Sequence, residues 1–140
     1  MNLYAIISAT TLHQLNLGLA IIRIGIGILF IRHGFPKLKN GIPEWQWLGD
    51  QMQFFGITFM PVFWGFLAAC AEFFGGVFLT LGIGTRIAAF FIACVMTAAI
   101  NMHWHKGDPW GYISHPIALL IIMIGLMVAG GGSYSLEQYL

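Results

Sequence analysis

Long apolar runs separated by short polar stretches dominate the pattern of this chain. Four runs are close to the ~20 apolar residues that an α-helix needs to cross a bilayer, and they cover about residues 15–33, 60–81, 86–103 and 114–130. The connector at residues 41–56 mixes aromatic residues with acids and glutamines, which is typical of an amphipathic segment at the lipid headgroups. We therefore expect an all-α membrane protein, a single domain over residues 1–140. Its predicted architecture is a four-transmembrane-helix bundle with a short amphipathic interfacial segment in the first long loop.

One charge, Glu72, interrupts the apolar run from Pro61 to Leu81. A carboxylate near the middle of a membrane helix costs ~2.5–3.5 kcal/mol on insertion scales, so it should face protein and needs a proton or a cation. Small residues share its helical face because they recur at three- and four-residue spacing: Gly65, Ala68, Ala69, Gly75 and Gly76. The third run has a similar face with a four-residue repeat: Ala89, Ala93, Thr97 and Asn101. Such faces predict close helix–helix contacts in lipid, with Glu72 pointing into the bundle.

The composition supports the membrane class. Hydrophobic residues make up 59% of the chain and charged residues 8%, against roughly a quarter charged in soluble domains, and the mean hydropathy is +0.83. A net charge of +1 provides no basic patch, so we do not expect nucleic acid as a partner. The N-terminal stretch has no Lys or Arg and no clear small-residue cleavage site. We interpret it as mature chain rather than as a signal peptide.

A second intramembrane charge, Arg23, lies near the middle of the first run, and Gly34 and Pro36 predict the end of that helix. Counted from the same membrane face, Arg23 lies eleven residues from Gly34, and Glu72 lies eleven residues from Pro61. At about 1.5 Å per residue, these offsets place both charges at a similar depth. Since an unpaired charge is costly in low dielectric, we expect an Arg23–Glu72 ion pair. The pair would either fix the register of two helices or form a polar site for a ligand or a proton.

Alternate loops of a four-span bundle share one membrane face, and four of the five histidines belong to that face: His33, His103, His105 and His115. Four Lys and Arg residues lie there against one on the other face, so the positive-inside rule predicts that this side is cytoplasmic and both termini are outside. A histidine of this face, His33 or His103, can donate a hydrogen bond to a quinone carbonyl, and histidine can deliver protons near neutral pH. The alternative is that these histidines and Lys37 are ordinary interfacial anchors. The candidate ligand-binding pocket consists of Arg23, His33, Lys37, Glu72 and His103.

Metal ligation and a disulfide are both disfavoured. His103 and His105 are two residues apart, which places them on different faces of a helix, and no carboxylate completes a metal signature. Cys70 and Cys94 lie inside apolar runs, and we interpret both as small buried hydrophobic residues. We therefore expect no metal and no tightly bound cofactor, with a quinone as the candidate ligand.

Four motifs in this order resemble the DoxX family: Arg23 in a glycine-rich first run, His33-Gly34-x-x-Lys37, Glu72-x-x-Gly75-Gly76 and Gly82-x-Gly84-Thr85-Arg86. The resemblance covers nearly the whole chain, including the four-run layout. It implies a small multi-pass protein of a bacterial or archaeal cell (inner) membrane. It also implies association with oxidoreductase complexes, since similar proteins include a subunit of thiosulfate:quinone oxidoreductase, and others occur with superoxide-detoxifying and thiol-handling partners. It supplies no catalytic residues.

Two hypotheses on function follow. The first is a redox-associated, quinone-linked membrane subunit that acts with a partner protein, and whether the chain itself catalyses a step stays open. The second is a non-catalytic scaffold or assembly subunit of a larger membrane complex. A small-solute transporter ranks below both, because four short helices enclose a pore only as an oligomer and the chain has no inverted repeat. The expected partners are the lipid bilayer, other membrane or redox subunits, and further copies of this chain.

Overall fold

The computed structural model describes residues 3–140, with side chains from residue 8 onward. Within this part of the chain every regular element is helical, and the helices are α1 (Leu3–Asn40), α2 (Ile42–Asp50), α3 (Pro61–Leu81), α4 (Thr85–Lys106) and α5 (Trp110–Ala129). Two short 3₁₀ helices, η1 (Gln51–Phe55) and η2 (Leu136–Gln138), complete the set. Four helices are long and apolar enough to cross a membrane: α1, α3, α4 and α5. The predicted fold class is therefore confirmed.

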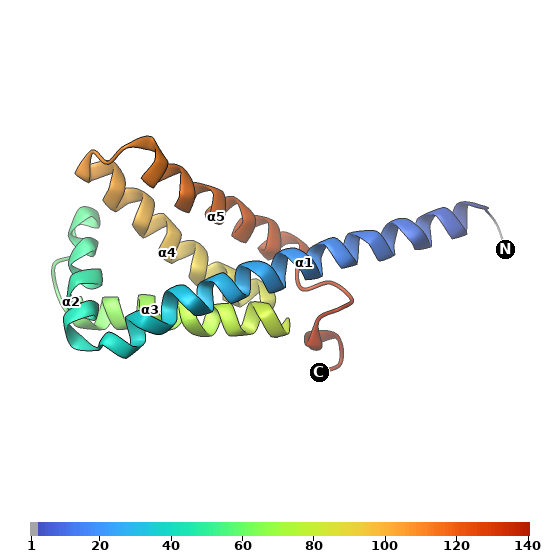
Figure 1. Cartoon of the computed structure of the whole chain (residues 1–140), viewed down its shortest axis with the longest axis horizontal. Coiled ribbons are helices and arrows are strands. Elements are labelled where there is room, and N and C mark those ends of the chain that lie inside the picture. The colour runs from blue at the N-terminus through green and yellow to red at the C-terminus, as the bar shows by residue number, and fades with distance from the viewer. Residues whose placement is uncertain (1–2) are drawn as a thin grey trace.

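The four long helices pack in series: α3 lies between α1 and α4, and α4 packs on α5. Figure 1 shows that the α1–α3 pair and the α4–α5 pair diverge toward one end of the bundle. Helix α2 runs across that end, where it contacts α3, and η1 contacts α4. The predicted segment is thus a short helix on the α1–α3 pair, and η1, which follows it, reaches α4 of the other pair.

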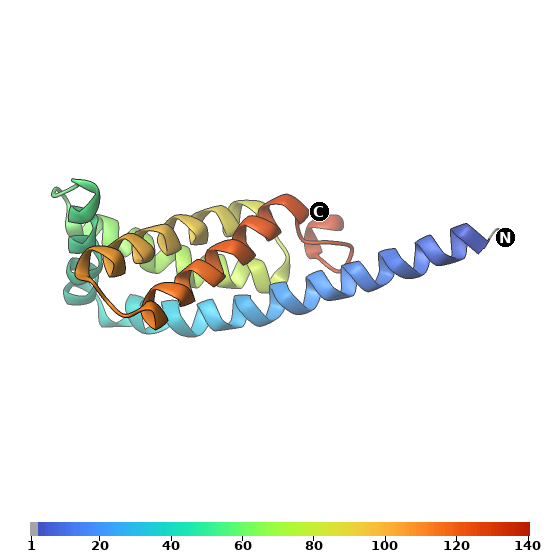
Figure 2. The ribbon, with the colours of Figure 1, turned by 90° about the horizontal axis from the view of Figure 1, so that it is seen from above.

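Helix α1 is much longer than a membrane span requires. Its 38 residues extend about 57 Å, and its N-terminal part projects beyond the other helices (Figures 1 and 2). The prediction that Gly34 and Pro36 end this helix is wrong, because α1 continues through both to Asn40. Gly34 instead allows close packing, because a Cβ atom at this position would come within 2.7 Å of the Cα atom of Phe73 on α3. Its missing side chain therefore lets two helices touch rather than ending one.

The small-residue face of α3 lies where the sequence pattern predicts, whereas that of α4 does so only in its first half. On α3 the buried residues are Gly65, Ala69, Glu72, Gly75, Gly76 and Leu79. On α4, Ala89 and Ala93 are buried, whereas Asn101 is half-buried and Thr97 is exposed. The apolar core is shared by α1, α3, α4 and α5, with Phe30, Leu79, Ile92 and Met123 among its buried members. Close backbone approach through small residues is the expected packing mode in lipid.

Helix α2 approaches α3 through two glycines. A Cβ on Gly65 would overlap the carbonyl of Trp45, and a Cβ on Gly49 would overlap the carbonyl of Pro61. Backbone therefore meets backbone at both points, which fixes α2 against the first turns of α3. This contact brings Trp45 close to the end of α1.

The C-terminal tail folds back over the opposite end of the bundle. As predicted, the glycines after α5 break that helix, and Gly130 has a φ of +77°. The backbone N–H of Glu137 then donates to the carbonyl of Gly82 at 2.9 Å, and the N–H of Ser133 donates to Oδ1 of Asn16 at 3.0 Å. The tail thereby connects α1 with the turn between α3 and α4.

Candidate functional site

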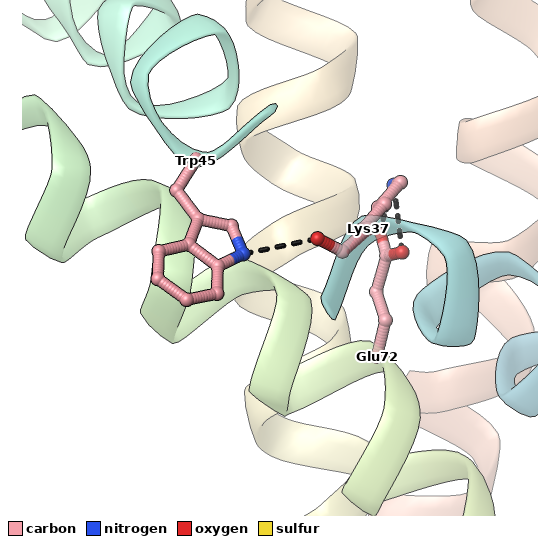
Figure 3. Close-up of polar contacts among 3 residues, drawn as sticks. All are labelled: Lys37, Trp45 and Glu72. Carbon is pink, nitrogen blue, oxygen red and sulfur yellow. Dashed lines mark hydrogen bonds and ion pairs between the residues drawn. The ribbon is translucent and has the colours of Figure 1, made fainter. Parts of the chain in front are cut away.

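Lys37 and Glu72 form the ion pair at the centre of the candidate site (Figure 3). Lys37 Nζ donates to Glu72 Oε1 at 2.8 Å and to Oε2 at 2.7 Å. Glu72 lies eleven residues after the start of α3 and nine before its end, which is close to the middle of a membrane span. Its side chain is 5% exposed, whereas that of Lys37 is 27% exposed. The pair neutralises the buried carboxylate, and the lysine side chain stays partly exposed.

Trp45 holds the backbone of Lys37 in place. Lys37 belongs to the last turn of α1, where helical carbonyls lack backbone donors. The indole Nε1–H of Trp45 donates to the Lys37 carbonyl at 2.9 Å, while the indole ring packs edge-on against Phe66 of α3, with ring centroids 4.8 Å apart. Trp45 and Glu72 approach Lys37 from different sides (Figure 3). Helices α1, α2 and α3 therefore position this lysine together.

The geometry leaves Lys37 with unused capacity to bind a ligand. A lysine ammonium has three N–H donors, and two of its hydrogen bonds go to Glu72. The remaining N–H can donate to an oxygen acceptor that enters from the exposed side. A hydrogen bond from a charged donor is stronger than a neutral one, particularly where the local dielectric is low.

Arg23 does not take part in this site, and the predicted Arg23–Glu72 ion pair is wrong. The guanidinium is 1% exposed. Its Nη1 donates to the carbonyls of Leu79 at 2.7 Å and Thr80 at 2.8 Å, and its Nη2 donates to the carbonyl of Tyr134 at 3.0 Å. Since the last carbonyls of a helix carry partial negative charge, a buried cation is favourable at the end of α3. Arg23 therefore joins α1, α3 and the tail.

The predicted depths of Arg23 and Glu72 are wrong because α1 does not end at Gly34 and Pro36. With α1 continuous to Asn40, Lys37 lies opposite Glu72, and Arg23 lies fourteen residues earlier on α1. Fourteen helical residues correspond to about 21 Å along the axis. Buried Arg23 and half-buried Lys37 therefore occupy separate sites on α1.

Glu137 is the acid nearest to the Arg23 site. Burial alone would raise the pKa of its carboxyl, but hydrogen bonds from the backbone N–H groups of Thr85 and Gly131, together with the charge of Arg23, outweigh burial and lower that pKa below 4.5. The two N–H donors lie 3.0 Å and 2.9 Å from its carboxylate oxygens. Glu137 therefore anchors the tail as an ionised group.

The remaining predicted pocket residues lie elsewhere. His33 is exposed on α1 beside Gly34, and His103 is paired with Asp108, with Nδ1 2.6 Å from Oδ2, at the end of α4. Of the five predicted residues, the structure brings together Lys37 and Glu72 only.

Two surface hollows flank α2. One of about 580 Å³ is lined by Trp45, Met60, Val62, Phe63 and Phe66, and one of about 340 Å³ is lined by Gly49, Asp50, Gln53, Ile57, Thr58 and Pro61. Neither lining includes any of the five residues of the predicted pocket.

The two cysteines are free. Cys70 on α3 is half-buried, so the interpretation as a buried hydrophobic residue fits it in part. Cys94 is exposed on α4, and the expectation of burial is wrong for it. Its place on the outer surface of a membrane helix suits a small apolar side chain equally well.

The sequence profile of the DoxX family matches residues 18–105. This chain belongs to the DoxX family. It is 28% identical over 124 residues, 89% of this chain and 87% of the relative, to the protein of Bacillus subtilis (strain 168) named "Putative oxidoreductase CatD". No solved structure matches the chain.

The family assignment and the four apolar helices together identify an integral, multi-pass membrane protein. The segment that matches the DoxX profile contains Arg23, Lys37, Trp45 and Glu72, whereas α5 and the tail lie outside it. Both partners of the central ion pair and the tryptophan beside them thus fall within the part of the chain that defines the family.

Proposed function

We propose that this DoxX-family chain is the membrane subunit of an oxidoreductase complex, and that its Lys37–Glu72 pair binds an oxygen of a quinone headgroup. The family and the name of the Bacillus subtilis relative support the link to oxidoreductases. The electrons come from a partner protein of the complex. The chain contributes a polar contact for the quinone inside the membrane.

One observation carries this proposal: the side chain of Lys37 is partly exposed beside a buried carboxylate at the middle of α3. A charged group at such depth is costly and is by default a functional feature. A quinone is an apolar molecule whose carbonyl oxygens accept hydrogen bonds, so the free N–H of Lys37 is a suitable donor. Nearby Glu72 can accept or release a proton as the quinone takes up two electrons and two protons.

The test is quinone binding to the purified chain in lipid nanodiscs, followed through tryptophan fluorescence with a short-chain ubiquinone. The double variant Lys37→Met with Glu72→Gln removes the site without leaving a buried charge. We expect its affinity to fall roughly 10-fold or more, since a hydrogen bond to a charged group contributes about 1.5–3 kcal/mol. The control is Lys39→Met, which removes an exposed lysine two residues away. Negligible binding by all three proteins would exclude the quinone.

A scaffold role is the second candidate, and the packing order favours it: among the described residues, α1 packs mainly along α3, and α5 packs mainly along α4. Such helices leave wide faces for other subunits. A complex that retains its activity when Lys37 and Glu72 are replaced, yet dissociates when this chain is deleted, would identify a scaffold. Loss of activity with the complex intact would instead support the quinone site.

A further inference from the structure

Among the side chains that the structure describes, Arg32 is an exposed cation on a membrane-spanning helix and has no counterion. The buried and half-buried charged residues of α1 and α3 have partners: Arg23 binds carbonyls, and Lys37 binds Glu72. From residue 8 onward, the chain provides no hydrogen bond or ion pair to the Arg32 side chain. Arg32 is therefore an exposed charge on α1 with no partner among these residues.

The neighbours of α1 show how deep Arg32 lies. Gly27 meets Gly76 and Thr80 of α3, and Gly34 meets Phe73. Arg32 lies between these two glycines, so it is level with the part of α3 between Phe73 and Gly76. That part is at least five residues, about 8 Å, from either end of α3. Since α3 is about as long as the ~30 Å hydrocarbon core is thick, Arg32 lies at hydrocarbon depth.

The face of α1 around Arg32 leaves room for another helix. Gly18, Gly25 and Arg32 are spaced seven residues apart, so they share one side of α1. At both glycines the space where a Cβ would lie has no neighbouring atom within 4 Å. Leu29, on the same side, is 50% exposed. An open glycine surface beside an unpaired charge is what a docked transmembrane helix would cover.

We propose that this face of α1 binds a transmembrane helix of a different protein, and that this helix places a carboxylate against Arg32. A second copy of the chain does not satisfy Arg32. Of its five acids, only Glu72 lies within a membrane span, and Lys37 already holds it. A symmetric contact between two such faces would also bring the two Arg32 guanidinium groups together. The inference rests on the proposed membership of a complex but not on the quinone.

The test is photo-cross-linking in the native membrane. A benzophenone amino acid at Leu29 probes the proposed face, and the same probe at Ile121, which is 64% exposed on α5, samples another lipid-facing surface. We expect the Leu29 probe, and not the Ile121 probe, to cross-link to a transmembrane helix of another protein that contains Asp or Glu. Cross-links from Leu29 only to lipid, or only to a second copy of this chain, would overturn the proposal.

Charge reversal then identifies the contact. Arg32→Glu should lower the Leu29 cross-link about tenfold, and reversing the partner's acid to Arg should restore it. Arg32→Gln, which keeps size and polarity, should give an intermediate loss, whereas Arg86→Glu on α4 should have no effect. A cross-link that Arg32→Glu leaves unchanged would overturn the proposal. Quinone binding by the purified Arg32→Glu chain should match wild type, so failure of this interface and failure of the quinone site are separable.

Discussion

The ammonium of Lys37 lies 2.7–2.8 Å from both carboxylate oxygens of Glu72, across the contact between α1 and α3. The pair is asymmetric, because the acid is 5% exposed and the lysine 27% exposed. Removing either partner therefore has different consequences. The acid depends on the lysine for its charge, whereas the lysine can reach solvent or a ligand.

The first prediction concerns stability. Lys37→Met should destabilise the protein, because it leaves Glu72 buried without a cation. Breaking a buried pair costs up to about 3–5 kcal/mol, and the partial exposure of Lys37 reduces this cost. The double variant Lys37→Met with Glu72→Gln should recover most of the loss. Thermal unfolding in detergent measures both. Equal destabilisation by the single and double variants would show that the pair has no energetic coupling.

The second prediction concerns helix contact. Gly34→Ala should separate α1 from α3, because the new methyl group would overlap the backbone of Phe73. Overpacking of this kind costs about 1–3 kcal/mol. Gly25→Ala is the matched control, since its position on the same helix is open, and it should leave stability unchanged or raise it slightly. Similar unfolding temperatures for the two variants would contradict the packing described above.

The third prediction concerns Arg23. Arg23→Gln removes the cation that binds the carbonyls of Leu79, Thr80 and Tyr134. We expect the tail to detach from the bundle and to become sensitive to protease. Arg23→Lys should rescue only in part, because a lysine keeps the charge but not the planar fork of donors. Arg32→Gln, an exposed arginine on the same helix, serves as the control. Equal protease sensitivity of Arg23→Gln and wild type would contradict the assigned role.

The fourth prediction concerns pH. Because the pKa of Glu137 is lowered in the folded protein, its contribution to tail attachment is fully present above the ordinary carboxyl value of 4.5. The contribution is lost as the pH falls below 4.5 through the folded-state pKa. Protease sensitivity of the tail should therefore rise as the pH decreases from 5 to about 3, with a protease active over that range. In Glu137→Gln the tail should be sensitive already at neutral pH, and the pH dependence should disappear.

The sequence predicted the four spans, the interfacial segment and the buried face of Glu72, because these follow from hydrophobic run length and from the spacing of small residues. The sequence did not predict Lys37 as the partner of Glu72. Glycine and proline usually mark helix ends, yet Gly34 is buried against Phe73, and α1 tolerates Pro36 six residues after its last buried large side chain, Phe30. Extending the helix to the next polar stretch would have placed Lys37, not Arg23, beside the acid.

Two further features were beyond sequence reasoning. Arg23 binds backbone carbonyls, and no pattern of side chains in the sequence predicts such partners. Trp45 and Glu137 act through contacts between segments far apart in the chain, which only the fold brings together. A signal for the tail existed in the three glycines followed by an isolated acid, since this composition favours a turn that returns to the bundle.

The most direct test of the proposed site observes the ammonium itself. The chain has three lysines, Lys37, Lys39 and Lys106, so solid-state NMR of the ¹⁵N-lysine-labelled protein in lipid should give few Nζ signals, and the spectrum of Lys37→Met assigns the relevant one. We predict that added short-chain ubiquinone shifts the Lys37 signal and leaves the signals of Lys39 and Lys106 in place. An unmoved Lys37 signal at saturating quinone would contradict the account.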